Sequence, residues 1–232
     1  MQASSTAPAT EMLTASEVVL VKGEHFSKPD KNGFPLPRDE AKVDPNPLAI
    51  AALEAAILEN ERAGAITLEQ GTEKRLFGLF KSKVVRLRAG GAAPQWPPLS
   101  YEGRIYDKVK QAGPEGITVK QLVIDLFPSD DDHPWIEVLQ QIALALRGRG
   151  LADEQTRETR SLKIFKLKSV VSILSPAGAA LAERHPVAPV QDLLASCKRD
   201  RPEVWSIIDS SVKAALHYRQ ESSDAYGSSS FD

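Results

Sequence analysis

The chain has 232 residues, of which 42% are hydrophobic and 26% charged, and its formal net charge is −2. This length allows one large domain or two small ones, each with a core of its own. The single cysteine, Cys197, excludes an internal disulfide and any cysteine-based zinc site. No apolar run approaches the roughly 20 residues of a membrane-spanning helix. Residues 1–10 also lack the basic start and apolar stretch of a signal peptide, so we expect a cytoplasmic protein.

Positive charge is concentrated in two stretches. Residues 74–88 carry +6 and residues 157–168 carry a net +4; we name them the first and the second basic segment. Because these segments together carry +10 and the whole chain carries −2, the remaining residues carry −12. Such separation can steer an anionic partner to one side of a protein, provided that both segments lie on that side.

The first predicted elements follow a short tail. Residues 1–10 are rich in Ala, Ser, Thr and Pro, and we predict that they are disordered. Thr14 with Glu17 three residues later forms a capping box, which predicts a short helix. Residues 22–46 contain four prolines and two glycines and predict a long irregular loop.

A longer helix and a basic hairpin come next. The helix is predicted from Asn46 to Ala63, and Gly64 ends it. Residues 65–68 and 84–88 are predicted to be paired strands, with residues 70–82 as a long hairpin tip. Four apolar residues lie in this tip between basic ones: Leu76, Phe77, Leu79 and Phe80.

A Gly-, Ala- and Pro-rich linker at residues 90–98 predicts a boundary between an N-terminal helical lobe, 11–89, and a second lobe, 99–185. C-terminal helices are expected over residues 186–219, and a Ser-rich disordered tail over residues 220–232.

Within the second lobe, helices are predicted over residues 101–112 and 118–127, and a third begins at Pro134. Its apolar positions Trp135, Leu139, Ile142 and Leu146 share one face. Gly148 and Gly150 are suited to end this helix in left-handed geometry.

A second basic hairpin follows this helix. Its chain is extended from Leu151, and the β-branched and aromatic run 161–174 turns or bulges near Ile164. Ser175 and Pro176 then begin a further helix, which runs through Arg184, and Pro202 begins the last one.

No catalytic or metal-binding constellation is evident. The loop Asp130, Asp131, Asp132 and His133 has no second cluster to complete a metal shell. The other histidines, His25, His185 and His217, have no Ser or Cys nucleophile beside them in the sequence. We therefore expect no enzymatic activity, no metal and no cofactor.

The order of features resembles the Golgi phosphoprotein 3 family over residues 11–195. The likeness is carried by the motifs Leu13–Leu20, Glu59–Ile66 and Leu146–Glu154 and by the hairpin that follows the last of them. The resemblance implies a mostly helical fold. It also implies an apolar hairpin that tethers the protein to a membrane, and a basic pocket with a tryptophan for a phosphoinositide headgroup.

That headgroup pocket does not carry over to this sequence. Leu53 stands where the family has its headgroup arginine in the first long helix, and Ile136 and Leu139 stand near the second arginine pair. The resemblance thus implies a membrane-facing hairpin more strongly than a specific lipid site.

The second half is also similar to a winged helix: three helices, a basic hairpin and a closing helix at Ser175. DNA-binding members present basic or amide side chains from the third helix. Here this helix offers Glu137, Gln140 and Gln141 behind an acidic loop, so a protein-interaction module is the better reading of this resemblance.

We therefore expect a mainly α fold: a multi-helix domain with two small β-hairpins and a winged-helix-like second half. The expected function is that of a peripheral membrane or adaptor protein that binds anionic, phosphoinositide-like lipid on the cytoplasmic face of a membrane. The alternatives are a winged-helix DNA-associated transcriptional regulator and a scaffold subunit that binds an acidic protein. The predicted contact residues are Lys74, Arg75, Leu76, Phe77, Phe80, Lys81, Lys83, Arg86, Lys163, Phe165, Lys166 and Lys168.

Overall fold

The computed structural model describes residues 12–75, 80–92, 94–127, 133–161 and 165–227. Of the residues, 58% are helical, so the predicted mainly α class is confirmed. The α-helices of the described residues are α1 (Ala15–Val21), α2 (Pro45–Arg62), α3 (Tyr101–Gln111), α4 (Val119–Leu126), α5 (Pro134–Gly148), α6 (Pro176–Arg184), α7 (Ala188–Asp200) and α8 (Pro202–Gly227). The strands are β1 (Pro29–Pro35), β2 (Lys42–Val43), β3 (Ile66–Arg75), β4 (Phe80–Ala89), β5 (Ile117–Thr118), β6 (Ala152–Ser161) and β7 (Phe165–Leu174), and two short 3-10 helices are η2 (Gly23–His25) and η3 (Gly113–Glu115). Within these ranges, none of the helices has both the length and the hydropathy to cross a membrane.

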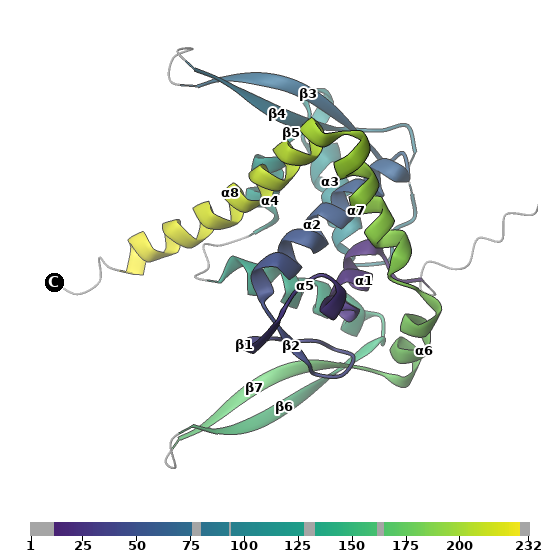
Figure 1. Cartoon of the computed structure of the whole chain (residues 1–232), viewed down its shortest axis with the longest axis vertical. Coiled ribbons are helices and arrows are strands. Elements are labelled where there is room, and N and C mark those ends of the chain that lie inside the picture. The colour runs from purple at the N-terminus through teal and green to yellow at the C-terminus, as the bar shows by residue number, and fades with distance from the viewer. Residues whose placement is uncertain (1–11, 76–79, 93, 128–132, 162–164, 228–232) are drawn as a thin grey trace, which may run out of the picture.

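Helix α2 lies at the centre of the molecule, with α1, α3, α5, α7 and α8 packed around it (Figure 1). Its start is capped by Asp44, whose carboxylate accepts a hydrogen bond of 3.0 Å from the backbone N–H of Asn46. Gly64, at φ +69°, ends it as predicted. The left-handed conformation costs glycine little because it has no Cβ. Leu53 and Ile57 are fully buried in α2.

The hydrophobic core is continuous across the predicted linker at residues 90–98, because α2 packs directly against α3 and α5. The linker itself is held in place by Trp96, whose indole N–H donates a hydrogen bond of 3.0 Å to Asn60 Oδ1. Asn60 in turn donates to the backbone oxygen of Glu102 at 3.0 Å. One buried cluster thus includes residues on both sides of 90–98, and the lobe boundary at this linker stays a prediction.

The prediction of an irregular loop over residues 22–46 is wrong in part, because β1 and β2 form a small antiparallel sheet there. Burial of Leu36 and Val43 anchors this segment against the core. β2 has only two residues, which is too short to show a period, and the seven residues of β1 do not alternate between apolar and polar. The prediction therefore rested on the prolines and glycines.

The first hairpin, β3–β4, is longer than predicted. Its strands pair in one register from Ile66 opposite Ala89 to Arg75 opposite Phe80, so most of the predicted tip, 70–82, is strand. The outer part lacks an apolar alternation because it extends beyond the core, and strand prediction depends on that alternation.

The second hairpin, β6–β7, pairs regularly from Ala152 opposite Leu174 to Ser161 opposite Phe165. The predicted turn near Ile164 falls at residues 162–164, outside the described residues.

Helix α5 begins at Pro134, as predicted. Its predicted apolar face is confirmed, with Leu139, Ile142 and Leu146 fully buried. Of the two glycines predicted to end it, Gly148 is still helical, and Gly150 at φ +70° takes the left-handed conformation. Helix α5 is thus a core helix.

The C-terminal part contains α6, α7 and α8. Ser175 caps α6 as predicted, accepting a hydrogen bond of 3.1 Å from the backbone N–H of Gly178. Cys197 is buried in α7, and burial raises the pKa of its thiol. Helix α8 continues to Gly227, beyond the predicted end near residue 219. No proline or glycine interrupts residues 220–226, so no breaker ends the helix earlier.

A buried polar cluster joins α1 to the end of α5. The Thr14 and Glu17 capping box is present, as predicted. The Glu17 carboxylate is completely buried and accepts two hydrogen bonds of 2.7 Å from the Arg149 guanidinium. Beside it, Glu102 accepts hydrogen bonds from the N–H and the hydroxyl of Ser16 at 2.8 and 3.0 Å. The pKa of Glu102 is raised to about 7, chiefly by burial.

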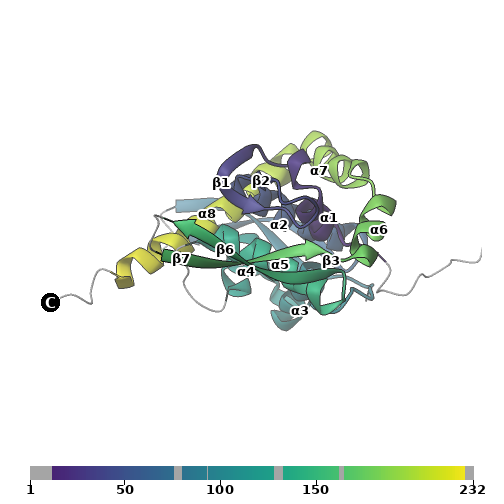
Figure 2. The ribbon, with the colours of Figure 1, turned by 90° about the horizontal axis from the view of Figure 1, so that it is seen from below.

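The two hairpins leave the body at opposite ends of the long axis (Figure 1). In both views their free ends and the end of α8 nevertheless lie on one side of the body (Figures 1 and 2). On that side the end of α8 extends farther from the body than either hairpin, so a partner there would meet α8 as well as the hairpins (Figures 1 and 2).

Candidate anion-binding surface

The first hairpin ends in a basic and aromatic pattern that its register reveals. The last pair is Arg75 opposite Phe80, and the pair before it is Lys74 opposite Lys81. Like charges directly opposite each other destabilise a hairpin. An anion placed between them offsets that repulsion.

The second hairpin repeats this pattern. Its last pair is Ser161 opposite Phe165, and the pair before it is Arg160 opposite Lys166. Both hairpins thus end with a phenylalanine on the second strand and, one position inward, two basic residues in direct register. The two hairpins share no sequence repeat strong enough to predict this correspondence.

Further along β4, the described basic side chains differ in their exposure and in their ion pairs. Lys81 and Lys83 are exposed. Lys83 is 71% exposed and lies 3.4 Å from the Glu203 carboxylate, itself 65% exposed. Such surface pairs contribute little and exchange readily with water and ions.

Arg86, which we predicted as a contact residue, is engaged within the protein. Its guanidinium lies 3.0 Å from the carboxylate of Glu73 and donates a hydrogen bond of 3.1 Å to the backbone oxygen of Glu115. Arg86 therefore holds β3, β4 and η3 together, and an external anion would have to compete with Glu73.

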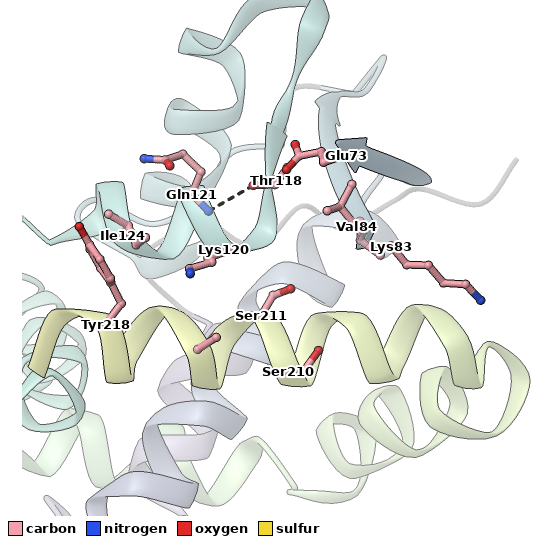
Figure 3. A pocket seen from close by; sticks show the side chains of 12 residues that line it. Glu73, Lys83, Val84, Thr118, Lys120, Gln121, Ile124, Ser210, Ser211 and Tyr218 are labelled. Atoms are coloured by element: carbon pink, nitrogen blue, oxygen red, sulfur yellow. Dashed lines mark hydrogen bonds between the residues drawn. The ribbon is translucent and has the colours of Figure 1, made fainter. Parts of the chain in front are cut away.

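A groove of about 620 Å³ opens beside the first hairpin, between β4, α4 and α8 (Figure 3). Side chains with hydroxyl, amide or ammonium groups form much of its wall. Its lining residues are Glu73, Lys83, Val84, Val85, Thr118, Lys120, Gln121, Ile124, Ser210, Ser211, Ala214 and Tyr218.

Lys120 is the basic residue of this groove that the sequence did not single out. It lies in the first turn of α4, outside both basic segments, and its ammonium nitrogen lies 5.5 Å from the centre of the Tyr218 ring. Thr118 caps the same helix, accepting a hydrogen bond of 3.3 Å from the backbone N–H of Gln121. No local signal marks Lys120, because Tyr218 lies almost a hundred residues away along the chain.

A second cavity, of about 660 Å³, lies between α5, the β1–β2 segment and the base of the second hairpin. Apolar groups such as Phe34, Ile136 and Leu144 dominate its wall, whereas Lys42 and Arg147 lie among acidic and polar lining residues. Of the positions compared with the headgroup arginines, Leu53 and Leu139 are fully buried and Ile136 lines this cavity. Leu53, Ile136 and Leu139 cannot supply the positive charge that a headgroup phosphate requires.

The predicted contact residues fall into two groups on separate hairpins. The strands hold Lys74, Arg75, Phe80, Lys81, Lys83, Arg86, Phe165, Lys166 and Lys168. Leu76, Phe77 and Lys163 lie outside the described residues. The fold places the two groups at opposite ends of the long axis and does not bring them together into one site.

Within the described ranges, no three His, Cys, Asp or Glu residues cluster as a metal site would require. Asp130, Asp131 and Asp132 lie outside these ranges.

The chain matches no protein-family model and no curated protein. Its function is therefore inferred from the hairpins and the groove beside them.

Proposed function

We propose that the protein is a non-enzymatic peripheral membrane or adaptor protein that binds anionic, phosphoinositide-like lipid surfaces through its two hairpins. This is the role implied by the resemblance to the Golgi phosphoprotein 3 family, and it locates the protein on the cytoplasmic face of a membrane. One observation carries the proposal: both hairpins end with a phenylalanine and, next to it, two basic residues opposite each other.

The chemistry of a membrane surface suits this pattern. Each Lys or Arg near an anionic leaflet contributes roughly 1 kcal/mol, and burial of an apolar side chain contributes about 25 cal/mol per Å². Each hairpin end has an aromatic residue in its last pair and two basic residues in the pair before it. It therefore offers both apolar burial and attraction to negative charge.

The position of the hairpins supports the same role. An isolated two-stranded hairpin is only marginally stable in water. Contact with a partner surface would therefore stabilise a long hairpin that projects from the body. Both hairpins point to one side of the body, where the end of α8 extends farther out than either (Figures 1 and 2). A membrane that contacts both hairpins would therefore also contact α8.

Cosedimentation with anionic vesicles tests the proposal. The wild-type protein is expected to bind at low salt, and the variant carrying Lys81→Glu, Lys83→Glu, Lys166→Glu and Lys168→Glu is expected not to bind. The control carries the same charge change at four exposed lysines elsewhere: Lys28, Lys31, Lys110 and Lys198. Absence of wild-type binding, or equal loss in the control and the hairpin variant, would refute the proposal.

A DNA-associated winged-helix regulator is the second candidate. The order α3, β5, α4, α5, β6, β7 is that of a winged helix. However, β5 pairs with β4 in the described residues, not with the second hairpin, and α5 packs against α2 with seven of its residues buried. Gel-shift titration with duplex DNA at about 50 and 200 mM salt separates this candidate from the first, because phosphate contacts weaken steeply over that range.

A scaffold subunit that binds an acidic protein is the third candidate, and it uses the same basic residues. Size-exclusion chromatography with cell extract would reveal such a complex. The scaffold candidate would be supported if the wild-type protein bound a protein partner but no vesicles, and the hairpin variant lost that partner.

A further inference from the structure

The groove between β4, α4 and α8 has a charge that favours anions. Its lining residues with charged side chains at neutral pH are Lys83, Lys120 and Glu73. The carboxylate of Glu73 is occupied by Arg86 at 3.0 Å. The Lys120 ammonium lies 5.5 Å from the centre of the Tyr218 ring, and a contact with a ring face leaves its N–H donors able to bind an external anion.

The remaining polar groups of the groove are neutral. Thr118, Ser210, Ser211 and Tyr218 contribute hydroxyls, and Gln121 contributes an amide that also donates a hydrogen bond of 2.7 Å to Asp125. Hydroxyls and amides both donate and accept. They suit a ligand that carries hydroxyl groups of its own.

Figure 3 shows that only some of these groups face one another, because the Gln121 amide points away from α8. Lys120 reaches from α4 toward α8, where Ser211 projects from the facing helix, and Lys83 is directed away from them. Tyr218 and Ile124 form the wall at one end. Lys120 is thus the ammonium best placed for a ligand in the groove, with apolar contact available beside it.

We propose that this groove binds a phosphate-bearing polyol, with the phosphate near Lys120 and the ligand's hydroxyls on Thr118 and Ser211. Its volume of about 620 Å³ lies within the range of roughly 300–1,000 Å³ for small-molecule sites. The ligand is either a soluble sugar or inositol phosphate or the headgroup of a lipid. The site lies beside the first hairpin and does not include the hairpin tips. It can therefore be tested independently of the membrane-binding proposal.

Calorimetry with soluble inositol trisphosphate and with inorganic phosphate tests the site. Lys120→Ala removes the ammonium, and Ala214→Glu adds a carboxylate to the wall of the groove at an exposed helical position. Each is expected to weaken inositol trisphosphate binding about tenfold, because the loss or reversal of one charge near the phosphate changes the attraction by that order.

Two control variants match these substitutions. Lys110→Ala removes a lysine that also lies over a tyrosine ring. Its ammonium nitrogen is 6.0 Å from the centre of the Tyr106 ring. Ala195→Glu adds a carboxylate at an exposed position of α7. Both controls are expected to bind like the wild type. Failure of the wild type to bind at millimolar concentration, or equal binding by groove variants and controls, would overturn the site.

A vesicle arm identifies the source of the ligand. If Ala214→Glu loses binding to phosphoinositide vesicles but keeps binding to vesicles of another anionic lipid, the groove takes a lipid headgroup. If soluble binding is lost and vesicle binding is unchanged, the groove takes a soluble phosphate. Binding of the soluble probe without any vesicle binding supports the groove and refutes the membrane role.

Discussion

Glu54 is a carboxyl group buried between the central helix α2 and the C-terminal helix α8, with 4% of its surface exposed. Its pKa is raised to about 8, first by burial, then by the charge of Asp209 and a hydrogen bond with it, whereas Lys213 and Lys198 act in the opposite direction. At neutral pH the folded protein therefore holds a proton on Glu54.

This proton makes stability depend on pH. Between the ordinary pKa of 4.5 and the folded value of about 8, the unfolded chain has released a proton that the folded protein retains. Stability is consequently highest below the lower value and falls as the pH rises through this window. The raised pKa of Glu102, about 7, acts in the same direction up to that pH, so the effect of Glu54 is best isolated above pH 7.

Replacement of Glu54 by Gln is expected to remove the decline above pH 7. At pH 8.5 the melting temperature should exceed that of the wild type by roughly 2–4 °C, equivalent to about 1 kcal/mol for a chain of this size. Thermal melts from pH 5 to 9 measure this, with the exposed Glu24→Gln as control. A Glu54→Gln profile parallel to that of the wild type would contradict the prediction.

The pair of Glu17 and Arg149 has 0% and 2% of its side-chain surface exposed. Replacing Arg149 by Met leaves a buried carboxylate without its main partner, and the expected cost is about 3–5 kcal/mol. Adding Glu17→Gln to this variant should recover part of the loss, since the unpaired charge is then absent. Urea unfolding of the single and double variants measures both, and equal stability of the two would contradict the prediction.

At the scale of the element, two basic residues opposite each other lower the stability of each hairpin and are proposed to contribute to membrane binding. Lys81 lies directly opposite Lys74 in the first hairpin. Replacing Lys81 by Glu places opposite charges in register, and we expect the hairpin to gain about 0.5 kcal/mol. Vesicle binding should weaken, because a cation at the surface is replaced by an anion.

Amide hydrogen exchange in β3 and β4 measures the stability of this hairpin, and cosedimentation measures binding. Lys81→Gln is the control and should give intermediate values in both. If Lys81→Glu left vesicle binding unchanged, the basic pair would serve only to keep the exposed strands from pairing with other chains.

For the whole molecule, the two hairpins lie at opposite ends of the long axis with their free ends on one side (Figure 1). A protein attached to one surface at two points gains avidity, because the second contact becomes intramolecular once the first is made. If both hairpins contact the membrane as proposed, each therefore strengthens the contact of the other.

Reversal of charge in one hairpin is expected to weaken vesicle binding by about 10²-fold. The paired variants are Lys81→Glu with Lys83→Glu, and Lys166→Glu with Lys168→Glu. Titration with vesicles at several salt concentrations should show a shallower salt dependence for each, because fewer charges take part. Full binding after reversal in one hairpin would mean that only the other hairpin touches the membrane.

The sequence by itself determined the boundaries of several helices and the places where positive charge concentrates. The starts of α5 and α6 and the end of α2 were predicted correctly, since a capping side chain, a first-turn proline and a left-handed glycine act on neighbours within about four residues. The buried face of α5 was also predicted, because its apolar period lies within one helix.

Only the tertiary structure decided the features that join distant parts of the chain. Glu17 and Arg149 are 132 residues apart, and Lys120 enters the groove because α4 packs against α8. The register that sets basic residues opposite each other depends on which backbone groups pair across two strands, and composition does not specify it. Local signals therefore define the elements, whereas the surfaces proposed to bind anions arise from long-range packing and strand pairing.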